Sequence, residues 1–346
     1  MLPSKPGRER VLEVELLEGF EALDKIEGEW DDLWLSSRER WVFLHPIWAR
    51  CWVSHYGEDV SPKLLCVRNE RGELVGLAPL CTSRGDPQVF KWIGGEELSD
   101  TQDLVIRRGW EAMVLSSLNG ILRKILGPRG RLDLHFVSEG SPILSEANDM
   151  LMEGWDVRIE LEECAPFVDL PETWEEFLSS LKGHHRHELR RKMGKLERSF
   201  PVRFREVATD DGWEEGLENF FRLHRASQVE KAQFMDKRRE AFFREMGWAF
   251  RKKGILRLTE LSVENGPVLA SAFSFVTGET WALYNSGFDP QYRQLSPGIV
   301  LVAKTIFAAI EEGLRRYDFL RGRELYKYDF GAKDRLLYKV SMAPRP

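Results

Sequence analysis

The sequence is poor in cysteine and lacks long apolar runs. Its 346 residues include four cysteines, which stand far apart without a CxxC pair. This argues against a disulfide framework or a zinc site and favours a reducing cytoplasm. The longest apolar runs, such as Ile299–Ala303, are far shorter than the ~20 residues that a membrane-spanning helix needs. Met1–Arg10 is polar and no apolar segment follows it, so we expect a flexible N-terminus without a secretory signal.

The composition is globular, but its charge is unevenly distributed. A hydrophobic fraction of 42% with 31% charged residues excludes wholesale disorder, and the length predicts about two domains. The net charge of −6 argues against a general polyanion-binding protein, so we expect no DNA partner. Residues 139–176 contain twelve acidic residues and one basic residue, whereas residues 182–205 contain nine Lys or Arg and two Glu. The basic segment leaves room for one local anion site.

Both halves of the chain alternate strand-like and helix-like patterns. The predicted helices are 20–35, one that begins at Pro46, 110–126, 174–181, the basic segment, 213–226, 238–250 and 297–312. The predicted strands are 11–17, 63–67, 74–81, 104–106, 132–137, 156–170, 202–207, 255–261, 268–276, 280–286, 317–320 and 335–340. This alternation predicts an α/β fold.

Two segments of the chain are similar to each other. Glu70–Ala78 aligns without a gap with Glu264–Ala272, and each contains a predicted hairpin turn and the start of a strand. Upstream residues match at a nearly equal offset: Phe43-Leu44 and Trp52 against Phe234-Met235 and Phe243. Two hairpins can resemble each other by chance, but the joint agreement of hairpin, helix pair and spacing favours a duplicated α/β unit.

The stretch before residue 300 carries the clearest chemical pattern. A predicted strand ends at Gly287, and the next helix has Ser296 as an expected N-cap, Pro297 at its first position and Gly298 just inside. Such a helix start leaves backbone N–H groups unpaired at the positive end of the helix dipole, which suits an anion. Arg293 could add a charge-assisted hydrogen bond. An ordinary capped helix without a ligand fits the same pattern.

These residues carry a resemblance to a known superfamily. The order strand–turn–Arg293-x-x-Ser296-x-Gly298–helix resembles the coenzyme A pyrophosphate loop, (Gln/Arg)-x-x-Gly-x-(Gly/Ala), of GNAT acyltransferases, with Ser296 in place of the usual first glycine. Tyr317-Asp318-Phe319-Leu320-Arg321-Gly322, followed by Tyr326-Lys327, looks like the YDFLRG-x-x-x-YK signature of the CelD/BcsL-like branch. That branch is named for cellulose-biosynthesis acetyltransferases and is related to FemAB-type transferases. The Phe43-Leu44-x-Pro46-x-Trp48 element and the basic run His185–Lys192 also look like this branch.

The resemblance implies two fused GNAT-like domains, residues 11–165 and 166–346, with mixed, mostly antiparallel sheets flanked by helices. It implies direct N- or O-acyl transfer from acetyl-CoA or another acyl-CoA, with no metal, to a sugar, a polysaccharide precursor or another small acceptor. The donor site is expected in the second domain. There the neighbouring strands 280–286 and 317–320 would splay apart, so that pantetheine pairs with an exposed strand edge.

Position in the motifs assigns the site residues. The expected donor-binding residues are Tyr284, Asn285, Arg293, Gln294, Ser296, Pro297, Gly298 and Ile299. The expected catalytic residues are Tyr326 as acid and Asp318 or Glu324 as base. The expected acceptor-binding residues are His185, Arg186, Arg190, Arg321 and Lys327. Each has a structural alternative: packing for Tyr326, a structural hydrogen bond for Asp318, a surface pair of Lys327 with Glu324, and a solvated charged face for the basic segment.

Two other functions stay open. The basic segment 182–205 favours a FemAB-type aminoacyl-tRNA-dependent ligase, the one case in which we expect an RNA partner. A non-catalytic binding protein that keeps the same fold is the other.

Overall fold

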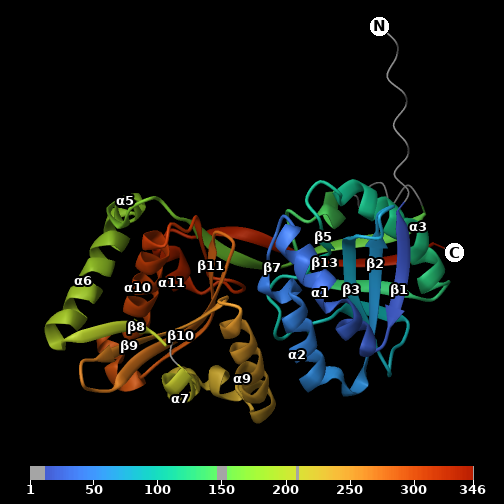
Figure 1. The fold of residues 1–346 in the computed structure, drawn as a ribbon. Helices are drawn as coiled ribbons and strands as arrows, with labels where there is room; N and C mark the ends of the chain where they lie inside the picture. Colours follow the sequence, from blue (N-terminus) through green and yellow to red (C-terminus); the bar gives the residue numbers. More distant parts are fainter. Residues whose placement is uncertain (1–11, 146–153, 208–209, 346) are drawn as a thin grey trace, which may run out of the picture. The chain divides into compact units, whose positions relative to one another are not determined.

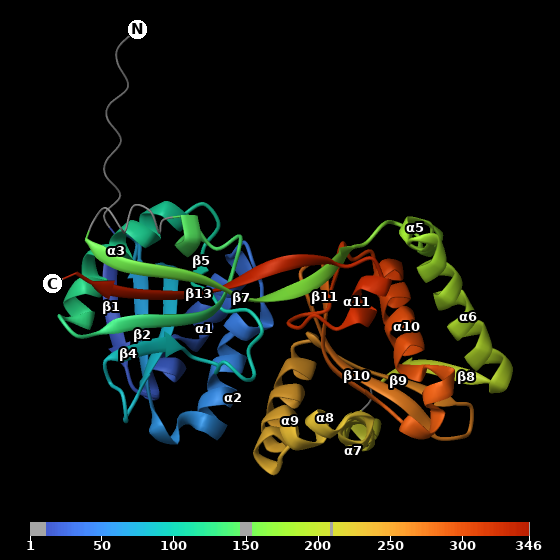
Figure 2. The same ribbon diagram turned by 180° about the vertical axis from the view of Figure 1, so that it is seen from behind.

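A computed structural model describes residues 12–145, 154–207 and 210–345 (Figures 1 and 2). The expected flexible segment 1–10 lies outside these residues. The strands are β1 Glu13–Glu18, β2 Val60–Arg68, β3 Leu74–Ser83, β4 Val89–Trp92, β5 Val105–Ile106, β6 Arg131–Ser138, β7 Trp155–Asp169, β8 Val202–Glu206, β9 Leu256–Val263, β10 Val268–Thr277, β11 Thr280–Phe288, β12 Arg316–Asp318 and β13 Lys333–Pro344. The helices are α1 Glu21–Ser36, α2 Pro46–Tyr56, α3 Glu111–Leu126, α5 Trp174–Ser180, α6 Gly183–Ser199, α7 Asp210–Ser227, α8 Val229–Phe234, α9 Lys237–Lys252, α10 Pro297–Glu311 and α11 Leu325–Asp329, with short 3-10 turns η1 Val42–Leu44, η2 Gly57–Asp59 and η3 Pro290–Leu295.

The predicted α/β class is confirmed: the strands form a mixed, mostly antiparallel sheet flanked by helices. The strand order is β1-β2-β3-β4-β6-β13-β7-β12-β11-β10-β9-β8, with β5 paired to β3. The chain divides into two units. Unit 1 extends to Glu162 and takes in the chain from Leu337 onwards, and unit 2 is Glu163–Leu336. The boundary between Glu162 and Glu163 lies close to the domain boundary expected at residue 165. The last part of β13, expected in the second domain, falls in unit 1. None of the described helices is long and apolar enough to cross a bilayer.

Unit 1 is built on an antiparallel meander of β1, β2 and β3. On one face of these strands, Leu65 and Val67 pack against α3, whose buried side chains include Val114 and Leu118 at helical spacing. Beyond β3, strand β4 pairs antiparallel with β3 and parallel with β6. Strand β6 in turn pairs antiparallel with the last part of β13.

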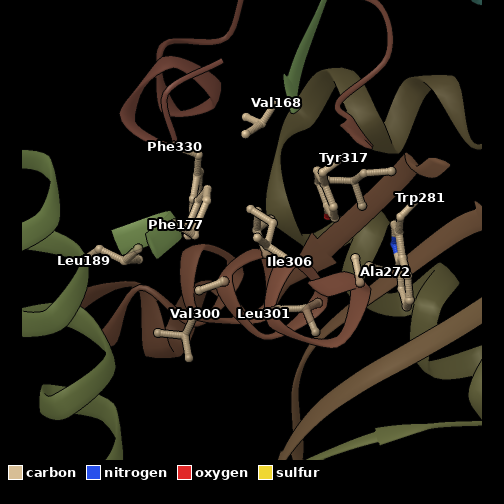
Figure 3. Packing of buried hydrophobic residues seen from close by; sticks show 14 of the residues in the cluster. Val168, Phe177, Leu189, Ala272, Trp281, Val300, Leu301, Ile306, Tyr317 and Phe330 are labelled. Atoms are coloured by element: carbon tan, nitrogen blue, oxygen red, sulfur yellow. The ribbon is translucent and has the colours of Figure 1, made fainter. Parts of the chain in front are cut away.

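Unit 2 repeats this order. Strands β9 and β10 form a hairpin like β2 and β3, and β11 pairs antiparallel with β10 and parallel with β12. Helix α10 packs against the sheet because its apolar residues Val300, Leu301 and Ile306 are all buried in one cluster (Figure 3). Tyr317 of β12 is fully buried beside them, and its hydroxyl meets the Thr305 hydroxyl of α10 at 2.8 Å.

The two segments aligned in the sequence have the same structure. Glu70–Ala78 and Glu264–Ala272 each contain a hairpin turn and the start of the second strand. Each turn has one left-handed residue, but at different aligned positions: Gly72 (φ 78°), which aligns with Gly266, and Asn265 (φ 56°), which aligns with Arg71. The shared strand order supports the duplication inferred from the sequence.

Candidate active site

The parallel pairing of β11 with β12 is short. It runs from Thr280↔Arg316 to Ala282↔Asp318 and then stops. Beyond this point β11 continues to Phe288 beside β10, whereas the chain after β12 turns away because Leu320 adopts the left-handed conformation (φ 56°). Within the described chain, the other edge of β11 therefore has no strand partner after Ala282. The expectation that these two strands are splayed neighbours is confirmed, although β12 ends two residues earlier than predicted.

The open edge of β11 leads, through η3, to the start of α10. Ser296 occupies the N-cap position, but its conformation is left-handed (φ 53°, ψ 47°) and its side chain makes no capping hydrogen bond, contrary to the prediction. Its carbonyl oxygen accepts from Val300 N at 3.1 Å. Pro297 has no N–H, so the first turn leaves the N–H groups of Gly298 and Ile299, and neither makes a hydrogen bond within the part of the chain described. Both residues are half-buried.

The turn η3 places two further predicted residues on the surface. Arg293 and Gln294 are both exposed. The Gln294 carbonyl accepts from Lys195 Nζ at 2.8 Å, and the Arg293 guanidinium has no partner among the described residues. Two unpaired amides and a nearby unpaired guanidinium are the donors that a diphosphate group requires. The start of α10 therefore presents two unpaired amides, Gly298 and Ile299, and the loop before it carries the unpaired Arg293.

The side chains of β11 connect this edge to α7, α8 and α9. The Tyr284 ring stacks on Phe243 of α9, with centroids 5.4 Å apart and planes 17° apart. Asn285 Oδ1 lies 3.0 Å from His224 Nε2 of α7. Tyr284 and Asn285 thus use their side chains within the protein, so a donor would meet the backbone of this strand.

Two residues that the sequence analysis did not identify lie at this end of β11. His224 is 1% exposed, and burial together with the charge of Lys231 lowers its pKa to about 4. Its Nδ1 has no hydrogen-bond partner among the described residues. Lys231 of α8 donates from Nζ to the Ser286 carbonyl of β11, and burial lowers its pKa to about 8. Their partners lie 61 and 55 positions away in sequence, and no motif marks either residue.

The loop after β12 is fixed by Lys327. This side chain is buried, and its Nζ donates to the carbonyl oxygens of Leu320 (3.1 Å), Arg321 (3.0 Å) and Gly322 (3.0 Å). It also lies 2.9 Å from Glu324 Oε2. The expected pair with Glu324 is present. The surface position expected for this pair is wrong for Lys327, which is buried. Its ammonium holds the loop backbone, which leaves it no donor for an acceptor molecule.

The three expected catalytic residues lie in different environments. Asp318 is fully buried, and its carboxylate accepts from Arg335 Nη1 at 2.7 Å and from Leu320 N at 2.8 Å. These bonds match the structural alternative, because both oxygens are engaged. Tyr326 packs edge-on against Phe319, and burial raises its pKa, so its hydroxyl stays protonated at neutral pH. Glu324 has a side chain that is 59% exposed.

The basic helix α6 contacts the candidate site through Lys195, which bonds to η3, and through His185. His185 Nδ1 lies 3.1 Å from Asp329 Oδ1 at the end of α11, the helix that carries Tyr326. Arg186 Nη1 donates to the Ser179 carbonyl at 3.3 Å, and Arg190 is exposed. The other face of α6 is structural, since Leu189 and Leu196 are buried in the cluster around α10.

Comparison with known proteins places these features in context. Residues 183–328 match the Acetyltransf_6 family, an acetyltransferase (GNAT) domain. The crystal structure of FemX is similar with a TM-score of 0.67 and 12% identity, covering 92% of this chain and 96% of that one. A conserved protein of unknown function from Bacteroides thetaiotaomicron VPI-5482 has a TM-score of 0.57 and 13% identity, covering 91% and 97%. L-PGS from Bacillus licheniformis has a TM-score of 0.50 and 11% identity, covering 80% and 82%.

No curated protein matches the chain. At these identities the solved structures show a common fold and nothing finer. The family match covers the open edge of β11, the start of α10 and the loop held by Lys327. Residues 183–328 are therefore similar in sequence to GNAT acetyltransferase domains, and the chain is similar in fold to FemX.

Proposed function

We propose that the protein is an acyl-CoA-dependent N- or O-acyltransferase whose donor site lies in unit 2. The observation that carries this proposal is the pair of unpaired amides, Gly298 and Ile299, at the start of α10, directly after the open edge of β11. Pantetheine would pair with this edge, and the diphosphate would bind the two amides and Arg293. The CelD/BcsL-like signature supports an acceptor such as a sugar, a polysaccharide precursor or another small molecule.

Bound acyl-CoA would supply a thioester carbonyl. The acceptor nitrogen or oxygen attacks this carbonyl carbon, so that a C–N or C–O bond forms as the C–S bond breaks. The attacking atom must lose its proton, and the leaving thiolate must gain one. The exposed carboxylate of Glu324 is our choice of base, because in the described chain only its Oε2 is paired, with Lys327, whereas both oxygens of the buried Asp318 are engaged. The protonated hydroxyl of Tyr326 is our choice of acid. The ammonium of Lys231, at the end of the open edge, would stabilise negative charge on the carbonyl oxygen.

Calorimetry with acetyl-CoA tests the donor site. We expect saturable binding to the wild-type protein and a loss of roughly tenfold or more for Arg293→Glu, because a charge-assisted bond is replaced by repulsion. Arg203→Glu is the matched control, since Arg203 is an exposed residue of β8, away from α10. If the wild-type protein gives no binding heat, or if both variants bind alike, the donor site is not at α10.

A FemAB-type aminoacyl-tRNA-dependent ligase is the second candidate. It is favoured by the fold similarity to FemX and by the exposed basic residues of α6, such as Arg190. In a filter-retention assay, a charged tRNA would be held with steeply salt-dependent affinity, because each phosphate contact releases counterions. Retention of charged tRNA, without binding of acetyl-CoA, would replace the first proposal with this one.

A further inference from the structure

A second pocket lies within unit 1, at the place where its own parallel strands diverge. Strands β4 and β6 pair at Val89↔Arg131 and Phe90↔Leu132, and the residues that follow them line a cavity of about 340 Å³. Its lining includes Lys91 and Trp92 of β4 and Asp133 and His135 of β6. The volume is at the lower end of the range for small-molecule sites, roughly 300–1,000 Å³. It repeats the position of the open edge in unit 2.

The charged groups of this pocket are already paired within unit 1. Lys91 Nζ donates to Glu96 Oε1 at 2.8 Å. Asp133 Oδ1 lies 3.0 Å from Lys339 Nζ, and His135 Nδ1 lies 2.5 Å from Glu162 Oε1. Because Lys91 and His135 are neutralised by carboxylates, the pocket offers no unpaired cation to a phosphate.

In the order of elements, α3 stands in unit 1 where α10 stands in unit 2, and the two helix starts differ in charge. In unit 2 the first turn of α10 has no acidic residue, whereas the first turn of α3 in unit 1 contains Glu111. A carboxylate at this position repels a diphosphate from the helix N-terminus. The start of α3 and the paired cations of the pocket therefore do not favour a second coenzyme A site in unit 1.

The groups without protein partners in the pocket are neutral. Gln102 is 2% exposed; its Nε2 donates to the Ile93 carbonyl at 2.9 Å, and its Oε1 has no partner among the described residues. The Thr82 hydroxyl also makes no hydrogen bond within the described chain, and the buried indole N–H of Trp92 has no partner there. Gln102, Thr82 and Trp92 therefore bring hydrogen-bonding groups without partners among the residues described to the lining of the pocket. Trp52 and Trp92 add aromatic surface to the lining.

We propose that this pocket binds an uncharged, polyhydroxylated molecule of about the size of a monosaccharide. One ligand hydroxyl would donate a hydrogen bond to Gln102 Oε1, and another would donate to or accept from the Thr82 hydroxyl. A sugar hydroxyl can act both as donor and as acceptor, so it suits both groups. A C–H face would pack on the indole of Trp52, which buries apolar surface at little entropic cost. The proposal rests on unit 1 alone and is independent of the acyltransferase proposed for unit 2.

Binding measured on the full chain by saturation-transfer NMR and calorimetry tests the proposal. The probes are D-glucose and N-acetyl-D-glucosamine, with D-glucose 6-phosphate as the charged form of the same ring. We expect saturable binding of at least one neutral sugar and weaker binding of the phosphate. Thr82→Val keeps the side-chain shape and removes the hydroxyl, and Gln102→Leu removes the amide. Each should weaken binding about three- to tenfold, the effect of losing one neutral hydrogen bond. Gln88→Leu, an exposed residue before β4, should bind like the wild type.

Three results would each overturn the proposal. These are no saturable binding of either neutral sugar, wild-type affinity in both Thr82→Val and Gln102→Leu, and glucose 6-phosphate binding as tightly as glucose. Circular dichroism of each variant checks folding, and the isosteric Thr82→Val covers the case in which Gln102→Leu does not fold. Acetyl-CoA binding by the same variants is a separate measurement, so a failure here leaves the unit 2 site untouched.

Discussion

Buried ionisable side chains hold the backbone around the open edge of β11. Lys327 binds three carbonyl oxygens, Asp318 binds Arg335, and His224 bonds to Asn285. Each of these groups is buried and has a specific partner, which is the condition under which burial of a polar group is tolerated. The signature that suggested an active site therefore contains residues that shape the site. Glu324, Tyr326 and Lys231 are the residues for which we propose chemical roles.

The neutral state of His224 predicts a pH dependence of stability. Its pKa is about 4 in the folded protein and near 6.5 when unfolded, so the unfolded chain binds one more proton between these values. Stability is therefore fully present above about pH 6.5 and falls as the pH drops towards 4, by roughly 3 kcal/mol at most. Urea unfolding at pH 7 and at pH 4.5 measures this loss of unfolding free energy. His224→Gln should lose less stability between the two pH values than the wild-type protein.

His187→Gln is the matched control for this prediction, because His187 is exposed on α6. It should follow the wild-type profile. The same acid sensitivity in the wild type and in His224→Gln would show that His224 is not the group that titrates.

The start of α10 shows how one element combines backbone conformation with a candidate ligand site. Ser296 is left-handed, a conformation that costs roughly 1–2 kcal/mol for a residue other than glycine. The superfamily pattern that this segment resembles has glycine at the corresponding position. Because the Ser296 side chain caps nothing, its hydroxyl does not offset the cost through a capping bond. The left-handed conformation of Ser296 is therefore strained, and it forms the turn after which the amides of Gly298 and Ile299 follow.

Ser296→Gly should stabilise the protein by about 0.5–1 kcal/mol. Glycine removes the cost of the left-handed conformation, but it also makes the unfolded chain more flexible, which cancels part of the gain. Urea unfolding measures the gain, and acetyl-CoA affinity should stay unchanged because the amides of α10 are untouched. Ser179→Gly, in the exposed part of α5, should instead destabilise by about 0.5 kcal/mol. Destabilisation by Ser296→Gly would contradict the strain argument.

The long elements were predictable from sequence, whereas the short ones and the long-range contacts were not. Helices α1, α3 and α10 have 15 or 16 residues and a sustained apolar period, so their positions follow from spacing alone. Helices α8 and α11 have six and five residues, too few to show a period. The burial of Lys327 could not be predicted, because it depends on three carbonyls brought together by the left-handed Leu320.

At the scale of the whole molecule, one strand serves both units in the same way. In unit 1, Asp133 of β6 lies 3.0 Å from Lys339 of β13, and in unit 2, Asp318 of β12 lies 2.7 Å from Arg335 of β13. Asp318 is the last paired residue of β12, and Asp133 is the first residue after the pairing of β6, so each ion pair lies near the end of a parallel pairing. This similarity agrees with a duplicated unit.

The division of β13 predicts which unit depends on its last residues. Val340 is fully buried, pairs with Leu134 of β6 and belongs to the core of unit 1. Val340→Asp buries an unpaired carboxylate there, which should cost several kcal/mol. In hydrogen exchange followed by mass spectrometry, we expect lost protection in β6 and β2, with β9 and β10 of unit 2 still protected. Arg345→Asp, at an exposed position, should leave the pattern unchanged. Loss of protection in β9 and β10 with β6 intact would contradict the assignment of this segment to unit 1.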